Sequence, residues 1–458
     1  MCSYLRLYFF WIQKPKEKKL DKYSNLNEKY YGPNNNDRVA LIESGEAGFF
    51  VRLNIIENAK ETIDISYYTL TGGKSVDLVL ASLLAAADRG VKIRILFDGI
   101  FHGLNKQLKN IKYSFSANPN IEYKLYEPLK VFKPRTWNDR LHDKLIIVDK
   151  SLGMIGGRNI GDKYFDQKSK TEQYSKDRDV IVYNANANNE ASSVKDMVNY
   201  YNDIFNYAQS IVVVPKLFKR KKIKGLKLKE KLIELYIKFR EKHIVEMKEI
   251  DWESKTQQTK GVKFVFNPIA RGNQDPWVLR KILSLASQAK ESILIQSPYV
   301  ILSDNMINKL KDYEFDLSKM KILTNSLACS PNPVAFAGYY NNKETIVDSG
   351  IALYEYQGPQ SLHGKTYIYD NKISAVGTFN FDARSSYINS EIMVIIYSEE
   401  FARKLINYVD IDLNNSLKVD KNYNYVIDPA IKAGFVSRFK KYLIKLLAKI
   451  VYFFDYLL

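Results

Sequence analysis

The sequence predicts an α/β protein made of two homologous lobes, and three observations support this. Apolar runs of strand length alternate with helix-length segments such as 76–89 (VDLVLASLLAAADR), which is typical of α/β lobes with largely buried sheets. Segments of the first half recur in the same order in the second half. The pattern H-x-K-x-x-x-x-D also occurs once in each half. We therefore expect one lobe over 39–215 and the other over 261–430.

The repeated segments begin, in each half, with a helix end that leads into a buried strand. Two β-rich runs follow, and the H-x-K element closes the series. The matched pairs are 59–68 with 289–299, 91–96 with 320–324, and 123–127 with 352–355. Four matches in one order indicate an internal duplication.

Length and composition fit two lobes and exclude some kinds of site. The chain has 458 residues, enough for two or three domains of roughly 150 each. Its two cysteines, Cys2 and Cys329, are far apart, which excludes a disulfide framework, a cysteine zinc site and a CxxC redox motif. The net charge of +18 favours a polyanion, either nucleic acid or an anionic membrane surface, although lysine can also serve solubility alone.

Two segments outside the lobes are basic. Residues 1–38 form a basic and aromatic N-terminal segment, whose apolar stretch 4–12 suits a membrane-surface anchor, the remnant of a leader, or a packed helix. Residues 216–260 form a basic helical connector, with a solvated linker favoured over a nucleic-acid-binding stripe. No stretch reaches the roughly 18 apolar residues expected of a transmembrane helix.

The C-terminal segment, 431–458, is predicted to be a basic amphipathic helix. Basic residues at helical spacing form one stripe: Arg438, Lys441, Lys445 and Lys449. The other side is apolar: Phe435, Phe439, Tyr442, Leu443, Leu446, Ile450, Phe453 and Leu457. This pattern suits an interfacial membrane helix. A terminal helix packed on a lobe would bury the same apolar residues, and the lysines favour the membrane slightly.

The duplicated motif carries the chemistry. Residues two apart on a strand point to the same face, so His and Lys of each copy should project together. Two copies with identical spacing make a purely structural histidine the weaker interpretation. The candidate catalytic residues are His142, Lys144 and Asp149 in the first copy and His363, Lys365 and Asp370 in the second. The two aspartates stand at strand ends, where we expect them to hold the site and not to react.

Each motif is followed at equal distance by a glycine turn and an asparagine. Asn159 and Asn380 are candidate phosphate-binding residues, because an amide can donate to a phosphate oxygen. Further on, Asp177 aligns with Glu391, giving one carboxylate per lobe. A carboxylate near a histidine fixes its tautomer and supports the imidazolium, so these two residues are expected to orient the histidines.

These residue types suit phosphodiester transfer. One histidine attacks phosphorus and forms a phosphohistidine, while the other protonates the leaving alcohol and then deprotonates the incoming one. The lysines and asparagines stabilise charge on the non-bridging oxygens. The sequence offers no convincing metal cluster, so neither a metal nor another cofactor is expected.

At these residues the chain resembles the phospholipase D superfamily, and specifically its bacterial cardiolipin synthase branch. The segments that carry the resemblance are 142–144, 156–165, 297–299, 323–327, 377–386 and 389–391. The resemblance spans roughly residues 40 to 415. It implies two phospholipase D-like lobes, each a mixed β-sheet flanked by helices, which share one active site. Thr378 stands where the family most often has serine, a change that keeps the hydroxyl.

The resemblance implies transfer of a phosphatidyl group, with phosphatidylglycerol as the expected acceptor and phosphatidylethanolamine as a second candidate substrate. It makes His142 the nucleophile and His363 the acid and base, although the sequence leaves that order open. The expected location is the cytoplasmic face of the cell membrane, reached peripherally, since no export signal is recognised. A hydrolase or nuclease would share the same intermediate, although the tail disfavours nucleic acid. An inactive membrane scaffold is disfavoured because both motifs are complete.

Overall fold

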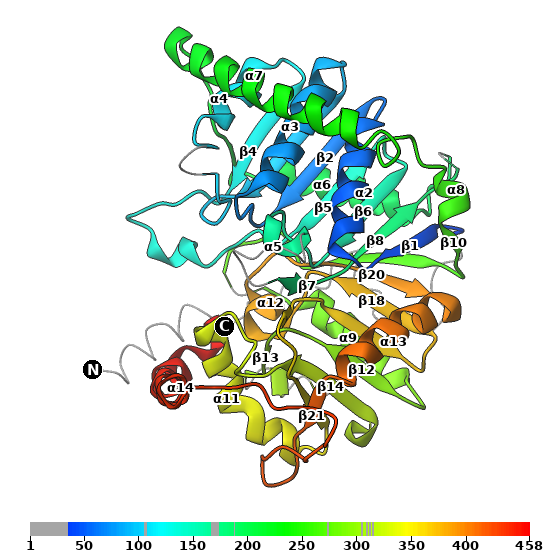
Figure 1. Ribbon diagram of the computed structural model, residues 1–458, viewed down its shortest axis with the longest axis vertical. Coiled ribbons are helices and arrows are strands. Elements are labelled where there is room, and N and C mark those ends of the chain that lie inside the picture. Colours follow the sequence, from blue (N-terminus) through cyan, green and yellow to red (C-terminus); the bar gives the residue numbers. More distant parts are fainter. Residues whose placement is uncertain are drawn as a thin grey trace. The chain divides into compact units, whose positions relative to one another are not determined.

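The computed structural model describes residues 35–458 except 105–107, 166–173, 187, 273, 304–305, 308–309, 311–312 and 314–315. The apolar N-terminal stretch 4–12 lies outside the described residues. The chain divides into two compact units at Phe264–Val265, and each unit is described by itself (Figure 1).

The first unit, Pro33–Phe264, is built on a nine-stranded mixed sheet in the order β10-β1-β8-β6-β5-β2-β3-β4-β9. The strands β2, β3 and β4 are parallel, and the remaining pairings are antiparallel. The strands are β1 (Arg38–Ile42), β2 (Thr62–Tyr67), β3 (Lys92–Asp98), β4 (Ile121–Tyr126), β5 (Lys144–Val148), β6 (Leu152–Gly156), β8 (Asp179–Tyr183), β9 (Ser210–Val212) and β10 (Gln257–Gln258), with a short β7 (Ser175–Lys176) outside this sheet.

Helices cover both faces of this sheet because its strands are buried on both sides. Alternate residues of β2 show it: Tyr67 bonds to Arg52 of α2, whereas Asp64 binds Arg94, which contacts Asn202 of α6. The helices are α2 (Gly45–Glu57), α3 (Lys74–Asp88), α4 (Ile111–Ala117), α5 (Asp162–Phe165), α6 (Ser193–Phe205), α7 (Lys219–Lys242) and α8 (Trp252–Lys255), with a 3₁₀ turn η2 (Pro134–Trp137).

The basic segment 216–260 belongs to the first compact unit. Its helix α7 packs on α3 and α4 and buries Gly225, Leu232 and Tyr236, while its lysines other than the half-buried Lys229 remain exposed. A carbon at the Gly225 Cβ position would lie 2.5 Å from the Tyr113 carbonyl carbon, so glycine permits this close approach to α4. The segment therefore forms an outer layer of the first lobe.

The second unit, Val265–Leu458, has an eight-stranded mixed sheet in the order β11-β20-β18-β17-β12-β14-β15-β21. Here β12, β14 and β15 are parallel. The strands are β11 (Val262–Phe266), β12 (Ile293–Gln296), β14 (Met320–Asn325), β15 (Ala352–Tyr356), β17 (Thr366–Tyr369), β18 (Ile373–Gly377), β20 (Ile392–Tyr397) and β21 (Ser416–Lys418); β13 (Val300–Ile301) pairs with β19 (Phe381–Asp382), and β16 (Ser361–Leu362) is short.

Helices also lie on both faces of the second sheet. Tyr369 of β17 donates to the Ile282 carbonyl of α9, and Gln296 at the end of β12 donates to Asp412 of α13. The helices are α9 (Trp277–Gln288), α11 (Pro333–Asp348), α12 (Ala383–Tyr387), α13 (Glu399–Leu413) and α14 (Arg438–Val451), with 3₁₀ turns η3 (Leu317–Lys319) and η4 (Tyr452–Leu457).

The two sheets correspond strand by strand. Reading β1-β8-β6-β5-β2-β3-β4-β9 against β11-β20-β18-β17-β12-β14-β15-β21 matches eight positions, and the first lobe adds β10 at one edge. The predicted fold of two homologous lobes, each a mixed sheet flanked by helices, is therefore confirmed. No helix among the described residues has the length and apolar character needed to cross a membrane.

Candidate active site

The first motif lies where the carboxyl ends of β2, β3 and β4 meet the amino end of β5. Tyr67 ends β2 and pairs with Lys144, which begins β5. His142 precedes the strand and is 9% exposed, with its ring 5.1 Å from the ring of Tyr68. The Lys144 ammonium donates to the His142 carbonyl at 2.7 Å and lies 5.4 Å from the Tyr68 ring centre. His142 and Lys144 are thus held together at one edge of the sheet.

Asp143, between them, points the other way. Its carboxylate is fully buried and accepts hydrogen bonds from the Ser66 hydroxyl at 3.1 Å and the Tyr200 hydroxyl at 3.0 Å. These bonds fix the peptide that joins His142 to Lys144. The role of Asp143 was not predicted from the sequence, in which it stands between His142 and Lys144 and ahead of the apolar run.

The second motif repeats the arrangement. His363 is half-buried ahead of β17, and the Lys365 ammonium lies 3.0 Å from its Nδ1 and also donates to its carbonyl. Gly364 stands where the first lobe has Asp143. Each lobe therefore folds its lysine back onto the histidine of the same motif, as the spacing predicts.

Asp149 and Asp370 are not brought to the histidines of their motifs. Seven residues along an extended chain span roughly 20 Å, so each aspartate lies at the far end of its strand. Each is the first of two consecutive positive-φ residues in a type I′ turn between two strands (φ 48° and 51°). Each carboxylate accepts three backbone N–H groups, from Lys60 to Thr62 in one lobe and from Lys290 to Ser292 in the other, at 2.7–3.0 Å. They hold the opposite edge of each sheet together.

Asn159 and Asn380 occupy matching positions after β6 and β18. Both are buried, and in the part of the chain that the structure describes neither side-chain oxygen has a hydrogen-bond partner. The Asn159 amide nitrogen donates to the Tyr164 hydroxyl at 3.1 Å. Since an unsatisfied buried polar atom costs about 1–3 kcal/mol, both amides suit a polar ligand. Rotating either amide by 180° would present N–H to an anion instead.

The two carboxylates, Asp177 and Glu391, are equivalent in the structure. The backbone amide of Gly157 donates to the carbonyl of Arg178, the residue that follows Asp177. In the same way, the backbone amide of Thr378 donates to the carbonyl of Ile392, which follows Glu391. Both carboxylates are buried. Glu391 accepts the Thr378 hydroxyl and, at 3.3 Å, the Asn389 amide. The threonine hydroxyl thus fixes one carboxylate oxygen.

An ion cluster supports the first lobe and was not identified from the sequence. Asp179 accepts from Arg52 at 2.7 and 3.0 Å and from Arg158 at 2.9 Å, and all three side chains are buried. Arg158 also donates to the carbonyls of Asp177 and Tyr164. It therefore connects the predicted orienting carboxylate to the tyrosine that binds Asn159.

Asp382, the N-cap of α12, makes stability depend on pH. Burial, reinforced by Glu391, raises its pKa from 3.8 to about 6. The folded state therefore binds a proton on the Asp382 carboxyl more tightly than the unfolded chain does. The stabilisation that this proton gives the folded state is complete below about pH 4 and is lost as the pH rises through 6. Asp382→Asn keeps the helix cap but has no carboxyl group to titrate. We therefore expect the free energy of unfolding of the variant, minus that of the unsubstituted protein, to be roughly 3 kcal/mol larger at pH 7 than at pH 4. Urea denaturation at both values measures this, and a constant difference would contradict it.

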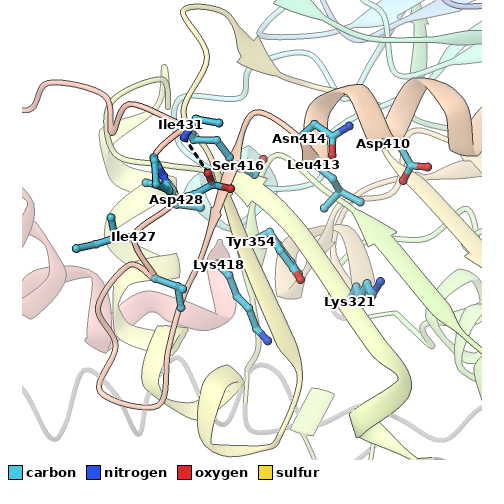
Figure 2. A pocket seen from close by; sticks show the side chains of 14 residues that line it. Lys321, Tyr354, Asp410, Leu413, Asn414, Ser416, Lys418, Ile427, Asp428 and Ile431 are labelled. Atoms are coloured by element: carbon cyan, nitrogen blue, oxygen red, sulfur yellow. Dashed lines mark hydrogen bonds between the residues drawn. The ribbon is translucent and has the colours of Figure 1, made fainter.

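A separate pocket of about 700 Å³ lies at the edge of the second sheet formed by β14, β15 and β21 (Figure 2). Lys321, Tyr354 and Lys418 line one part, and Asp410 and Asp428 also contribute. None of the predicted site residues lines it. Among the described residues, no group of three or more His, Cys, Asp or Glu side chains could hold a metal ion.

Comparison with known proteins places both motifs inside family matches. A family model described as "Cardiolipin synthase, PLD-like domain" matches residues 53–196 and 282–413, one match per lobe. Cardiolipin synthase C of Escherichia coli is 27% identical over 401 residues, covering 79% of this chain and 82% of that protein. An uncharacterised protein of Helicobacter pylori is 28% identical over 403 residues, covering 81% and 78%.

A solved structure has the same fold. The crystal structure of phosphatidylserine synthase from Haemophilus influenzae superimposes with a TM-score of 0.63 at 16% identity, covering 93% of this chain and 98% of that one. This likeness extends the fold agreement over both lobes.

Proposed function

Because this chain belongs to the family of cardiolipin synthases with phospholipase D-like domains, we propose that it is a phosphatidyltransferase of the cardiolipin synthase type. It transfers a phosphatidyl group through a phosphohistidine to an alcohol, with phosphatidylglycerol as the first candidate acceptor. The observation that carries the proposal is the matched geometry of the two motifs: a histidine at the sheet edge, a lysine folded onto it, and a buried asparagine whose amide oxygen has no hydrogen-bond partner among the described residues.

In the proposed mechanism the two lobes act on one phosphodiester. His142 attacks phosphorus, forming a P–N bond as the P–O bond to the leaving alcohol breaks, and His363 gives that alkoxide a proton. His363 then removes a proton from the acceptor alcohol, whose oxygen attacks phosphorus and releases His142. Lys144, Lys365 and the two asparagines stabilise the non-bridging oxygens, and Asp177 and Glu391 orient the imidazoles.

The C-terminal helix supports a lipid substrate over nucleic acid. Helix α14 packs on α11 through one stripe, in which Ala448 and Val451 contact Ala337, and Ile444 is also buried. A second apolar stripe is exposed: Phe435, Phe439, Tyr442, Leu446, Ile450 and Phe453. The basic residues form a third stripe at positions 438, 441, 445 and 449. We therefore propose peripheral attachment to an anionic membrane surface through the two exposed stripes.

This attachment predicts a loss of vesicle binding on substitution. Phe439→Asp with Leu446→Asp places two charges in the exposed stripe and leaves the packed stripe intact. We expect binding to phosphatidylglycerol vesicles, measured by sedimentation, to weaken at least tenfold, because apolar burial and attraction to anionic lipid act together. Ile411→Asp, at an exposed apolar position on α13, is the matched control. Equal binding by all three proteins would contradict the attachment.

The function itself is tested with purified protein and labelled phosphatidylglycerol, alone and with phosphatidylethanolamine, in vesicles. Labelled cardiolipin is the expected product. Phosphatidic acid alone would instead identify a hydrolase. Absence of lipid turnover together with nicking of plasmid DNA, which should weaken steeply with salt, would identify a nuclease.

A further inference from the structure

Exposed apolar side chains gather on two loops at the catalytic edge of the first lobe. The loops follow β3 and β4, whose carboxyl ends lie at the edge where His142 stands. We call these residues the apolar rim: Phe101, Leu129, Val131, Phe132 and Trp137. Phe132 is 98% exposed. The first lobe buries a large core elsewhere, so its folding does not use these side chains.

The rim is connected to the motif by a chain of rings. Phe101 lies 5.5 Å from Tyr68 between ring centroids, and Tyr68 lies 5.1 Å from His142. Only one ring therefore separates the rim from the imidazole. A substrate whose phosphodiester reaches His142 from the side of Phe101 carries its neighbouring groups past this apolar surface.

The longer loop is built on a fixed frame. Arg140 is buried and donates to the carbonyls of Glu127 and Thr136 at 3.1 Å, and it pairs with Asp98. The Trp137 indole donates to the Lys130 carbonyl at 2.9 Å. These bonds close the base of the loop and leave Val131 and Phe132 at its tip. Their exposure is therefore a property of the fold.

The charge around the tip fits an anionic lipid layer. The loop sequence 128–137 (PLKVFKPRTW) contains three basic residues and no acidic one. Lys133, beside Phe132, is exposed. Single-stranded nucleic acid also stacks on aromatic side chains beside basic ones. Leu129 and Val131 are aliphatic, however, and cannot stack on bases, whereas acyl chains accept aliphatic and aromatic side chains alike.

We propose that the apolar rim enters the interfacial layer of a phospholipid bilayer and contacts the acyl chains of the lipid that presents its phosphodiester to His142. The proposal rests on the proposed function and names the substrate as a lipid taken directly from a bilayer. The glycerol side of that lipid lies against Phe101 and Tyr68, and Phe132 lies among the acyl chains.

Insertion is tested without catalysis by comparing Phe132→Trp with Val245→Trp. Val245 belongs to the same lobe and is 77% exposed. It lies near the end of the sheet opposite to His142: the carbonyl of nearby Met247 accepts from Asn58, which is close in sequence to the amides that bind Asp149. With vesicles of phosphatidylglycerol and brominated phosphatidylcholine, we expect added quenching of tryptophan emission at position 132 and none at 245. Vesicle-bound protein without quenching at 132 would overturn the proposal, as would quenching by an oligonucleotide in place of lipid.

The catalytic consequence is tested with Val131→Asp/Phe132→Asp. Turnover is measured on vesicles and on dispersed short-chain phosphatidylglycerol, and the ratio of the two rates is compared between proteins. We expect this ratio to fall about tenfold in the double variant, because two carboxylates oppose insertion, and to stay unchanged in Val245→Asp. An unchanged ratio in both variants would overturn the proposal. If the unsubstituted protein turns over neither lipid, the proposed function fails, and the quenching result still decides insertion.

Discussion

Replacing His142 by alanine is expected to lower phosphatidyl transfer by about 10⁴-fold or more, because the covalent route through a phosphohistidine is lost. His363→Ala should lower it by a similar factor, since residues that act as a unit give non-additive losses. The double variant should therefore be scarcely worse than either single one. The rate of cardiolipin formation from labelled phosphatidylglycerol measures all three.

His243→Ala is the matched control for this prediction. His243 caps the end of α7 and stacks on Phe239 at 4.3 Å, away from both motifs in sequence and unused in the mechanism. It should retain nearly full activity. Quenching in alkaline denaturant, which preserves an acid-labile P–N bond, separates the two histidine roles: phosphatidyl label should remain attached to His363→Ala protein and be absent from His142→Ala protein. The reverse pattern would exchange the roles, and full activity in either variant would refute the mechanism.

The largest loss of stability is expected from Asp179→Ala. This substitution leaves Arg52 and Arg158 buried without the carboxylate that both of them bind. Removing one partner of a buried ion pair costs roughly 3–5 kcal/mol, because the remaining charge stays out of water. Hydrogen exchange of the β6 and β8 amides under increasing urea measures the effect within the first lobe.

A solvent-exposed ion pair serves as the comparison. Glu249 pairs with Lys60 in the same lobe, with both side chains more than 60% exposed, so Glu249→Ala should cost less than about 1 kcal/mol. The second lobe shows that the fold itself does not require the ion cluster, since buried Phe379 and Met393 stand where the first lobe has Arg158 and Asp179. Equal protection in Asp179→Ala and the unsubstituted protein would contradict the predicted cost.

The sequence was sufficient to predict the duplicated fold, because strand-like runs and motif spacing recur in both halves. It also predicted that each lysine would lie with its histidine, which follows from the two-residue period of a strand. The distance between Asp149 and His142 depends on how far β5 extends before its turn, and the motif spacing alone did not show this. The bonds from Asp149 to three amides depend on residues more than 80 positions away.

Other features depended on tertiary packing and were not predictable from local pattern. Arg52, Arg158 and Asp179 come from three distant segments, so no short motif marks their cluster. In α14 a helical pattern shows where apolar residues lie but not which of them the neighbouring helix covers. The packed stripe consists of Ile444, Ala448 and Val451, which lie outside the predicted apolar side, whereas most residues of that predicted side are exposed.

The two carboxylates that are predicted to orient the histidines have different neighbours in the two lobes, and this has an evolutionary consequence. A carbon at the Gly157 Cβ position would lie 2.4 Å from the Asp177 carboxylate, whereas Thr378 at the same place bonds the longer Glu391. Gly157→Thr alone would create a clash with Asp177 in the first lobe. Glu391→Asp alone would leave a side chain too short to reach the Thr378 hydroxyl as Glu391 does in the second. Change at these positions is therefore tolerated best when both members of a pair change together, so the two halves of a duplicated chain can keep distinct residue pairs.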